Sequence, residues 1–182
     1  EKYRQAVLAD NNARRDGRYK IWNTIDLNTP RAKALVKLIV DRGTFVSPTL
    51  AVFERQKGDK DTTDVHVRGA IVDADAPVMT AGAKVVVGSH SSVPHANRGW
   101  AYQRELELLV ESGLTPMQAI VAGTAENARF FRVADRLGTI ESGKLADLLL
   151  VEGDPSKNIS DMRRVKRVMI NGRWVPAEAE SK

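Results

Sequence analysis

Apolar and polar positions follow two different rhythms along the chain, and the rhythm changes near residue 138. Before that point, apolar residues at helical spacing predict helices that begin near residues 30, 100, 116 and 124. Two short runs between helices, residues 44–50 and 84–87, predict strands. The second run is nearly all apolar, which is typical of a strand buried on both faces of a parallel sheet. The sequence therefore predicts an α/β arrangement in its first three quarters.

Local signals mark several of these boundaries, and strands replace helices after residue 138. Thr115 and Gln118 have the spacing of a capping box, with Pro116 at the first helical position. Residues 146–153, 164–170 and 173–175 then predict strands. The last two are joined by Asn171-Gly172, the strongest short signal for a β-hairpin.

Composition excludes several classes of protein. The 182 residues are 42% hydrophobic, enough for a buried core, and no apolar run approaches the length that spans a bilayer. The net charge of +5 lies mainly in residues 1–20 and 161–173, so no broad face for nucleic acid is expected. With no cysteine, disulfides and thiolate metal sites are absent. We expect a cytoplasmic protein with no membrane partner and no specific nucleic-acid partner.

One motif resembles a phosphate-binding loop but does not fit one. The segment Gly138 to Lys144 satisfies the first seven positions of that pattern. Leu145 stands where a Ser or Thr is needed for magnesium, and a strand follows instead of a helix. A turn bounded by two glycines is the better interpretation.

Two of the three histidines are candidates for chemistry. His66 lies in a charged segment and is most simply a surface residue. His90 stands at the carboxyl end of the strand predicted from residue 84, and His95 lies five residues further on in the following loop. In α/β proteins, ligands bind at this edge of the sheet. Histidine can bind a metal or accept a proton near neutral pH. No histidine pair or carboxylate cluster has metal-ligand spacing, and no Gly-x-Ser-x-Gly nucleophile motif is present.

The order of elements and several segments resemble the C-terminal part of the metal-dependent amidohydrolase superfamily, particularly its imidazolonepropionase-related and prolidase-like branches. The resemblance covers most of residues 30–175, and it depends above all on Gly-Leu-Thr-Pro-x-x-Ala-Ile at 113–120 and Gly-x-Ile-x-x-Gly-Lys-x-Ala-Asp-Leu at 138–148. It implies the last two strands of a TIM-like (β/α)8 barrel with their helices, at 44–50 and 84–90, followed by strands of a small sandwich domain.

This resemblance implies a division of the chain into three parts. Residues 1–137 would be a partial barrel segment, 138–176 the C-terminal portion of the sandwich and 177–182 a tail. A whole barrel takes about 250 residues, so we expect the first six strands to lie outside this sequence. The unpaired strand edges predict a homo-oligomer.

The resemblance also implies an activity, which is hydrolysis of a C–N bond in a small-molecule amide, cyclic amide or dipeptide by metal-activated water. Many members end the eighth strand in Gly-Thr-Asp or Gly-Ser-Asp, whereas this chain has Gly88-Ser89-His90. His90 would then be the metal ligand or the proton acceptor, and His95, Asn97 and Arg98 would line the substrate mouth. The cofactor would be a divalent metal, zinc in the full-length form, held weakly or not at all by this chain alone.

Two other interpretations remain open from the sequence alone. The chain could be a catalytically incompetent fragment or degenerate homologue with a structural or assembly role. It could also be a basic binding module that uses its two positive ends on an anionic partner, in which case binding would depend strongly on salt.

Overall fold

A computed structural model of the chain describes residues 10, 26–54, 78 and 80–176. In chain order its elements are α3 (Pro30–Asp41), β1 (Phe45–Val46), α4 (Leu50–Phe53), β2 (Lys84–Val85), α6 (Ala101–Glu111), α7 (Pro116–Val121), the π-helix η1 (Ala122–Glu126), α8 (Asn127–Phe130), β3 (Leu148–Val151), the 3-10 helix η2 (Ile159–Arg163), β4 (Val165–Ile170) and β5 (Arg173–Trp174). His66 and most of the loop after Glu54 lie outside the described residues.

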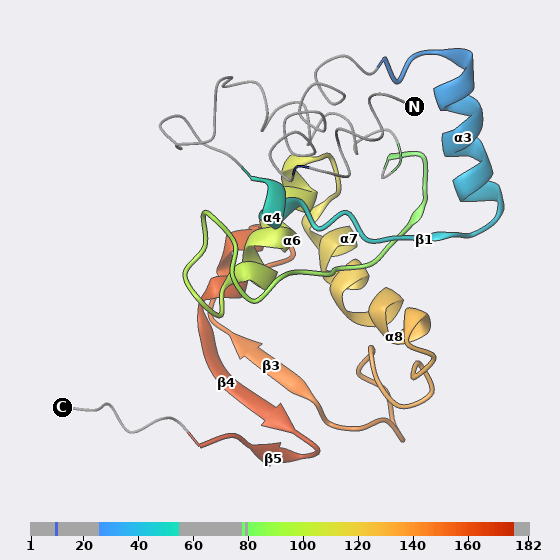
Figure 1. The fold of residues 1–182 in the computed structure, drawn as a ribbon. Helices are drawn as coiled ribbons and strands as arrows, with labels where there is room; N and C mark the ends of the chain where they lie inside the picture. The colour runs from blue at the N-terminus through green and yellow to red at the C-terminus, as the bar shows by residue number, and fades with distance from the viewer. Residues whose placement is uncertain (1–9, 11–25, 55–77, 79, 177–182) are drawn as a thin grey trace.

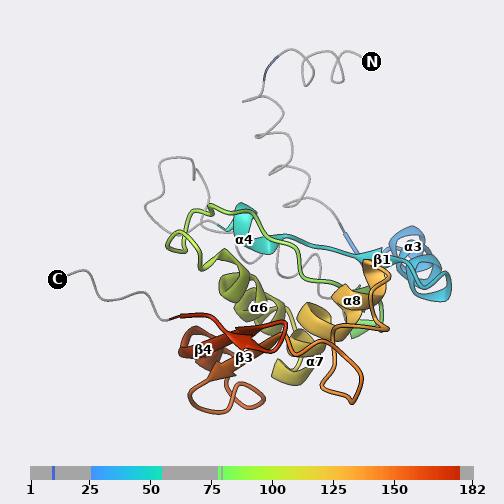
Figure 2. The same ribbon diagram turned by 90° about the horizontal axis from the view of Figure 1, so that it is seen from below.

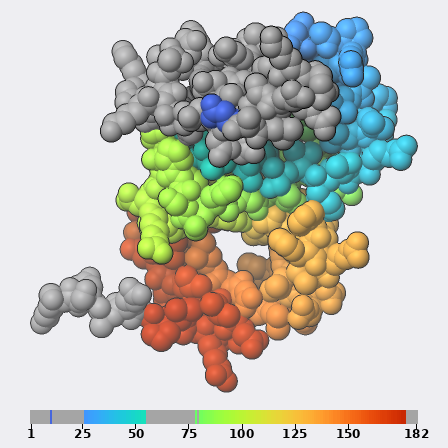
Figure 3. Space-filling model, in the orientation of Figure 1, coloured from blue at the N-terminus to red at the C-terminus, as the bar shows by residue number. Residues whose placement is uncertain are grey.

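The described strands form two separate sheets. Strands β1 and β2 pair in parallel, with Phe45 opposite Lys84, while β3, β4 and β5 form an antiparallel sheet in that order. Helix α8 lies between β1 and the antiparallel strands in both ribbon views (Figures 1 and 2). The space-filling view places the antiparallel strands, in orange to red, at the opposite end of the molecule from α3, in blue (Figure 3). The predicted mixed α/β character is confirmed.

Local sequence signals set several element ends as predicted. The Thr29 side chain accepts a hydrogen bond from the Ala32 amide at the start of α3, and Thr115 and Gln118 form a complete capping box on α7. Asn171 and Gly172 both have positive φ, which is the backbone of a tight hairpin turn between β4 and β5. These ends are encoded within a few residues, so periodicity and capping rules find them.

Three predicted boundaries are wrong. The strand predicted over 44–50 ends at Val46, and Leu50 begins α4; Pro48 has no amide hydrogen to continue a ladder. The strand predicted over 84–87 is assigned only at Lys84–Val85, although Val86 still donates to the Val46 carbonyl at 2.9 Å. No new helix begins near Thr124, because the π-helix continues α7 without a break into α8.

One hydrophobic core contains residues from Leu50 to Ile159. Its centre is α6, whose Leu106, Leu108 and Leu109 are at most 1% exposed. Residues of α4 and β2 pack on one side, and Ile159 of η2 joins the same cluster. The 3-10 helix η2 is therefore packed against α6.

The turn between α8 and β3 supports the first prediction. Gly138 has φ +96°, and a Cβ there would lie 2.6 Å from the Ala128 Cβ and 3.1 Å from the Ala125 Cα. We expect Gly138→Ala to lower the free energy of unfolding by about 2 to 3 kcal/mol, from backbone strain together with overpacking. Gly143 has φ +88°, and nothing lies within 4 Å of a Cβ built there. Gly143→Ala therefore introduces backbone strain without overpacking, and it should lower the free energy of unfolding by about 1 kcal/mol. If urea unfolding showed the same loss of stability in Gly138→Ala and Gly143→Ala, overpacking at Gly138 would be contradicted.

Candidate functional site

The carboxyl ends of β1 and β2 lie side by side, because parallel pairing points both strands the same way. The strands approach closely here, since a Cβ on Gly88 would lie 2.6 Å from the Ser47 hydroxyl and 3.4 Å from the Thr49 methyl carbon. Only glycine fits at position 88 without moving Ser47. The Gly88-Ser89-His90 segment thus leaves the sheet directly beside the end of β1.

Each sequence-predicted site residue lies at this edge or in the loop that follows it. His90 is exposed, and the Ser89 hydroxyl donates to the His90 carbonyl oxygen at 3.1 Å, which engages it in a local turn. His95 is half-buried, whereas Asn97 and Arg98 are exposed. The loop is anchored by Val93, which is buried and bridges to Ala96. Buried Val93 therefore anchors the loop to the core, while the side chains of His90, Asn97 and Arg98 stay exposed.

The end of β1 is held in an unusual backbone conformation. Thr49 has φ +53°, a left-handed value that is costly for a β-branched residue. Directly after it, the amides of Leu50 and Ala51 donate to the two carboxylate oxygens of Glu105, at 2.8 and 2.7 Å. Glu105 is 0% exposed. This buried carboxylate on α6 fixes the turn that carries Ser47 and Thr49 next to Gly88.

An ion-pair network extends from this turn into the C-terminal segment. Arg104 makes a bidentate pair with Glu54, at 2.8 and 2.7 Å, and also donates to Glu107 at 2.9 Å and Glu111 at 3.0 Å. Arg163 of η2 donates to both oxygens of Glu107. Burial alone would raise the pKa of Glu107, but the hydrogen bonds from the two arginines outweigh burial and lower that pKa.

Sequence reasoning missed the polar residues that support this edge. Glu105 and Asn127 lie among apolar residues of helices, and the backbone amides that they bind, those of Leu50 and Val87, are 55 and 40 positions away. A polar residue on the buried side of a helical pattern was the one available signal, and it does not reveal the partner.

The described residues alone do not fit a metal site. They contain no group of three or more His, Asp or Glu side chains placed to hold an ion. A zinc site normally uses three or four protein ligands, so an ion at His90 would need ligands from outside the described part of the chain.

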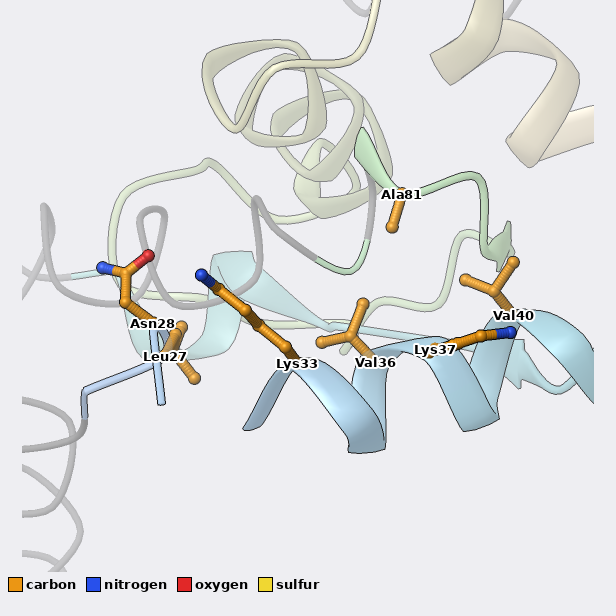
Figure 4. Close-up of a pocket in the computed structure, with 7 residues that line it drawn as sticks. All are labelled: Leu27, Asn28, Lys33, Val36, Lys37, Val40 and Ala81. Atoms are coloured by element: carbon orange, nitrogen blue, oxygen red, sulfur yellow. The ribbon is translucent and has the colours of Figure 1, made fainter. Parts of the chain in front are cut away.

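A pocket among the described residues lies away from this edge. It has a volume of about 370 Å³ and is lined by Leu27, Asn28, Lys33, Val36, Lys37, Val40 and Ala81 (Figure 4). Ala81 precedes β2, so the pocket lies toward the start of that strand and contains none of the four candidate residues.

Comparison with known proteins adds the family. A sequence model of the amidohydrolase family matches residues 23–175. The chain belongs to the amidohydrolase family. Among the described residues of this family member, no helix is long and apolar enough to cross a membrane.

Individual relatives include deaminases and a dipeptidase. The 5-methylthioadenosine/S-adenosylhomocysteine deaminase of Moorella thermoacetica is 29% identical over an alignment of 129 residues that covers 59% of this chain and 30% of the deaminase. The adenine deaminase of the same organism is 40% identical over 70 residues, 37% of this chain and 10% of that enzyme. The crystal structure of a Xaa-Pro dipeptidase with methionine bound in its active site superposes with a TM-score of 0.67 at 31% identity, over 79% of this chain and 37% of that chain.

These relatives confirm the predicted resemblance to amidohydrolases and their prolidase-like branch. The chain spans at most 37% of the length of any of the three.

Proposed function

We propose that the protein to which this chain belongs hydrolyses a C–N bond in a small amide, cyclic amide or dipeptide, and that residues 30–137 contribute the last two strands of its barrel. The observation that carries the proposal is the parallel β1–β2 pair, whose common carboxyl edge bears Gly88-Ser89-His90 in a chain of the amidohydrolase family. Ligands and reacting groups of α/β barrels gather at that edge. Residues 1–137 would be the barrel segment, 138–176 the sandwich portion and 177–182 a tail.

Within this proposal His90 is the reacting residue of the chain. Its exposed imidazole follows the end of β2, where it can accept a proton from an attacking water or act as one ligand of a divalent metal, zinc in the full-length form. A bound divalent metal would supply an activated water. Any other ligands of such a metal would come from outside the described part of the chain, so the proposal includes both roles of His90, proton acceptor and metal ligand.

The loop after His90 is proposed to bind the substrate. His95, Asn97 and Arg98 lie on a segment anchored through buried Val93, so their polar groups are carried on a fixed support beside His90. A guanidinium and an amide suit the carboxylate and carbonyl groups of a dipeptide or cyclic amide.

A non-catalytic role remains the second candidate. It starts from the two-stranded β1–β2 sheet, whose outer edges have no strand partner among the described residues. In that case the unpaired strand edges would serve assembly, with a homo-oligomer as the partner arrangement.

Substitution of His90 separates the two candidates. In the full-length protein we expect His90→Ala to lower kcat/KM by roughly 100-fold, the usual contribution of a general base. Because His90 is exposed, the free energy of unfolding should change by less than about 0.5 kcal/mol. His90→Asp, which restores the residue found in many superfamily members, should retain activity, and His95→Ala should act mainly on KM. Ammonia release and dipeptide cleavage would be assayed separately, and unchanged turnover in folded His90→Ala would remove His90 from the reaction.

A further inference from the structure

Among the described residues, β2 pairs with β1 on one side, and its other side, called here the free side, has no strand partner. The Val86 amide donates to the Val46 carbonyl at 2.9 Å, so the backbone groups of Val86 point toward β1. Successive residues of a strand direct their backbone groups to opposite sides, which turns the amide and carbonyl of Val87 away from β1. In a continued sheet, a further strand would pair with Val87 on that side.

The side chain of Asn127 occupies this position. Its Oδ1 accepts a hydrogen bond from the Val87 amide at 3.0 Å, and its Nδ2 donates to the Val87 carbonyl at 3.0 Å. A carboxamide thus reproduces the reciprocal pair that a neighbouring strand would make with one residue. Both backbone groups of Val87 are satisfied without a strand.

A π-helical turn and a tyrosine hold Asn127 in place. At the end of η1 the Asn127 amide donates to the Thr124 carbonyl, and the Gly123 carbonyl accepts from the Tyr102 hydroxyl at 2.6 Å. A Cβ on Gly123 would lie 2.5 Å from that hydroxyl, so the approach requires glycine. Burial raises the pKa of Tyr102 to about 12, opposed by a hydrogen bond with Asn127, so the hydroxyl stays protonated and can donate.

We propose that Asn127 is a positioning residue that ends the sheet at Val87 and thereby directs Gly88, Ser89 and His90 out of the sheet into the candidate site. A strand on the free side of β2 can then pair no further than Val85. The inference rests on the proposed function for its catalytic consequence, whereas its structural part concerns the backbone of Val87 and the ring of His90 alone.

The test compares Asn127→Ala and Asn127→Asp with a matched control in the full-length protein. Alanine removes both hydrogen bonds to Val87, and aspartate places a second acceptor against the Val87 carbonyl. The control is Gln118→Ala, which also removes a carboxamide from the same helical segment but acts on the α7 cap, away from β2. Each variant is measured for Val87 amide exchange, the nitrogen NMR shifts of the His90 ring, and kcat and KM per folded molecule.

In both Asn127 variants we expect the Val87 amide to lose its protection from exchange and the NMR signals of the His90 ring to shift. We also expect kcat to fall by about 10- to 100-fold with KM unchanged, since moving a reacting group by about 1 Å lowers the rate that much. Gln118→Ala should leave all three readouts at wild-type values. Unaltered His90 signals and kcat in folded Asn127→Ala would overturn the inference. If the wild-type protein hydrolyses no amide, the proposed function fails. The exchange rate of the Val87 amide and the NMR shifts of the His90 ring then still test the role of Asn127.

Discussion

Replacement of Arg104 by Met is expected to destabilise the protein by about 3 to 5 kcal/mol, the usual cost of removing one partner from a buried ion pair. The Arg104 side chain is 11% exposed, and the Glu54 and Glu107 side chains that it joins are 1% and 11% exposed. Methionine fills similar volume but leaves the Glu54 carboxylate without its bidentate partner. Because the network joins α4, α6 and η2, the loss should appear as a cooperative fall in the urea midpoint.

The effect of Arg104→Met should depend on pH in a defined direction. The pKa of Glu107 is lowered in the folded protein from an ordinary value of 4.5, so its pairing stabilises the fold above that value and is lost as pH falls below it. Without Arg104 the buried carboxyls bind protons more readily in the folded state. The stability difference between wild type and variant should therefore be largest above about pH 5 and narrow as the solution is acidified.

An exposed ion pair provides the control. Lys157 and Asp154 pair at 2.8 Å with side chains 85% and 48% exposed, so Lys157→Met should cost less than about 1 kcal/mol. Equal losses in Lys157→Met and Arg104→Met, or a difference that does not change between pH 7 and pH 4, would contradict a buried network.

The existence of the elements could be predicted from sequence because their signals are local. The capping box at Thr115 and Gln118 and the hairpin at Asn171-Gly172 each involve residues at most three positions apart. The path of the chain just after β1 and β2 could not be predicted, since Glu105 and Asn127 from distant helices bind the backbone there. An apolar strand pattern shows where strand pairing is favourable. It does not show which distant side chain will bind the backbone in place of a neighbouring strand, as Asn127 does at Val87.

The candidate site divides in the same way. His90 was found because a histidine after a buried apolar run indicates the carboxyl edge of a parallel sheet. The close approach of Ser47 to Gly88 could not be predicted, because it depends on the register of two strands that lie far apart in the sequence. The proposed activity comes from the family resemblance, whereas the structure shows which residues support the edge.

Removal of the Glu105 carboxylate should be comparably severe and should act on that edge directly. Glu105→Ala leaves the buried amides of Leu50 and Ala51 without their acceptors, at about 1 to 3 kcal/mol each, and opens a cavity beside Leu106 and Leu109. We expect a total loss of about 3 to 5 kcal/mol in urea unfolding. Glu105→Gln keeps the volume and one acceptor but turns an amide group toward the second N–H, so it should lose about half as much.

A second substitution separates lost hydrogen bonds from released strain. Thr49 stays at φ +53° because Glu105 fixes the two amides that follow it, and Thr49→Gly makes that conformation free of steric cost. If Glu105 holds the strain, Glu105→Ala lets the wild-type turn relax, so part of its cost is recovered as relief at Thr49. In the Thr49→Gly background no strain is left to relieve, and Glu105→Ala should cost about 1 kcal/mol more than it does beside Thr49. Additive effects in this double-mutant cycle would mean that the left-handed turn beside Gly88 persists without Glu105.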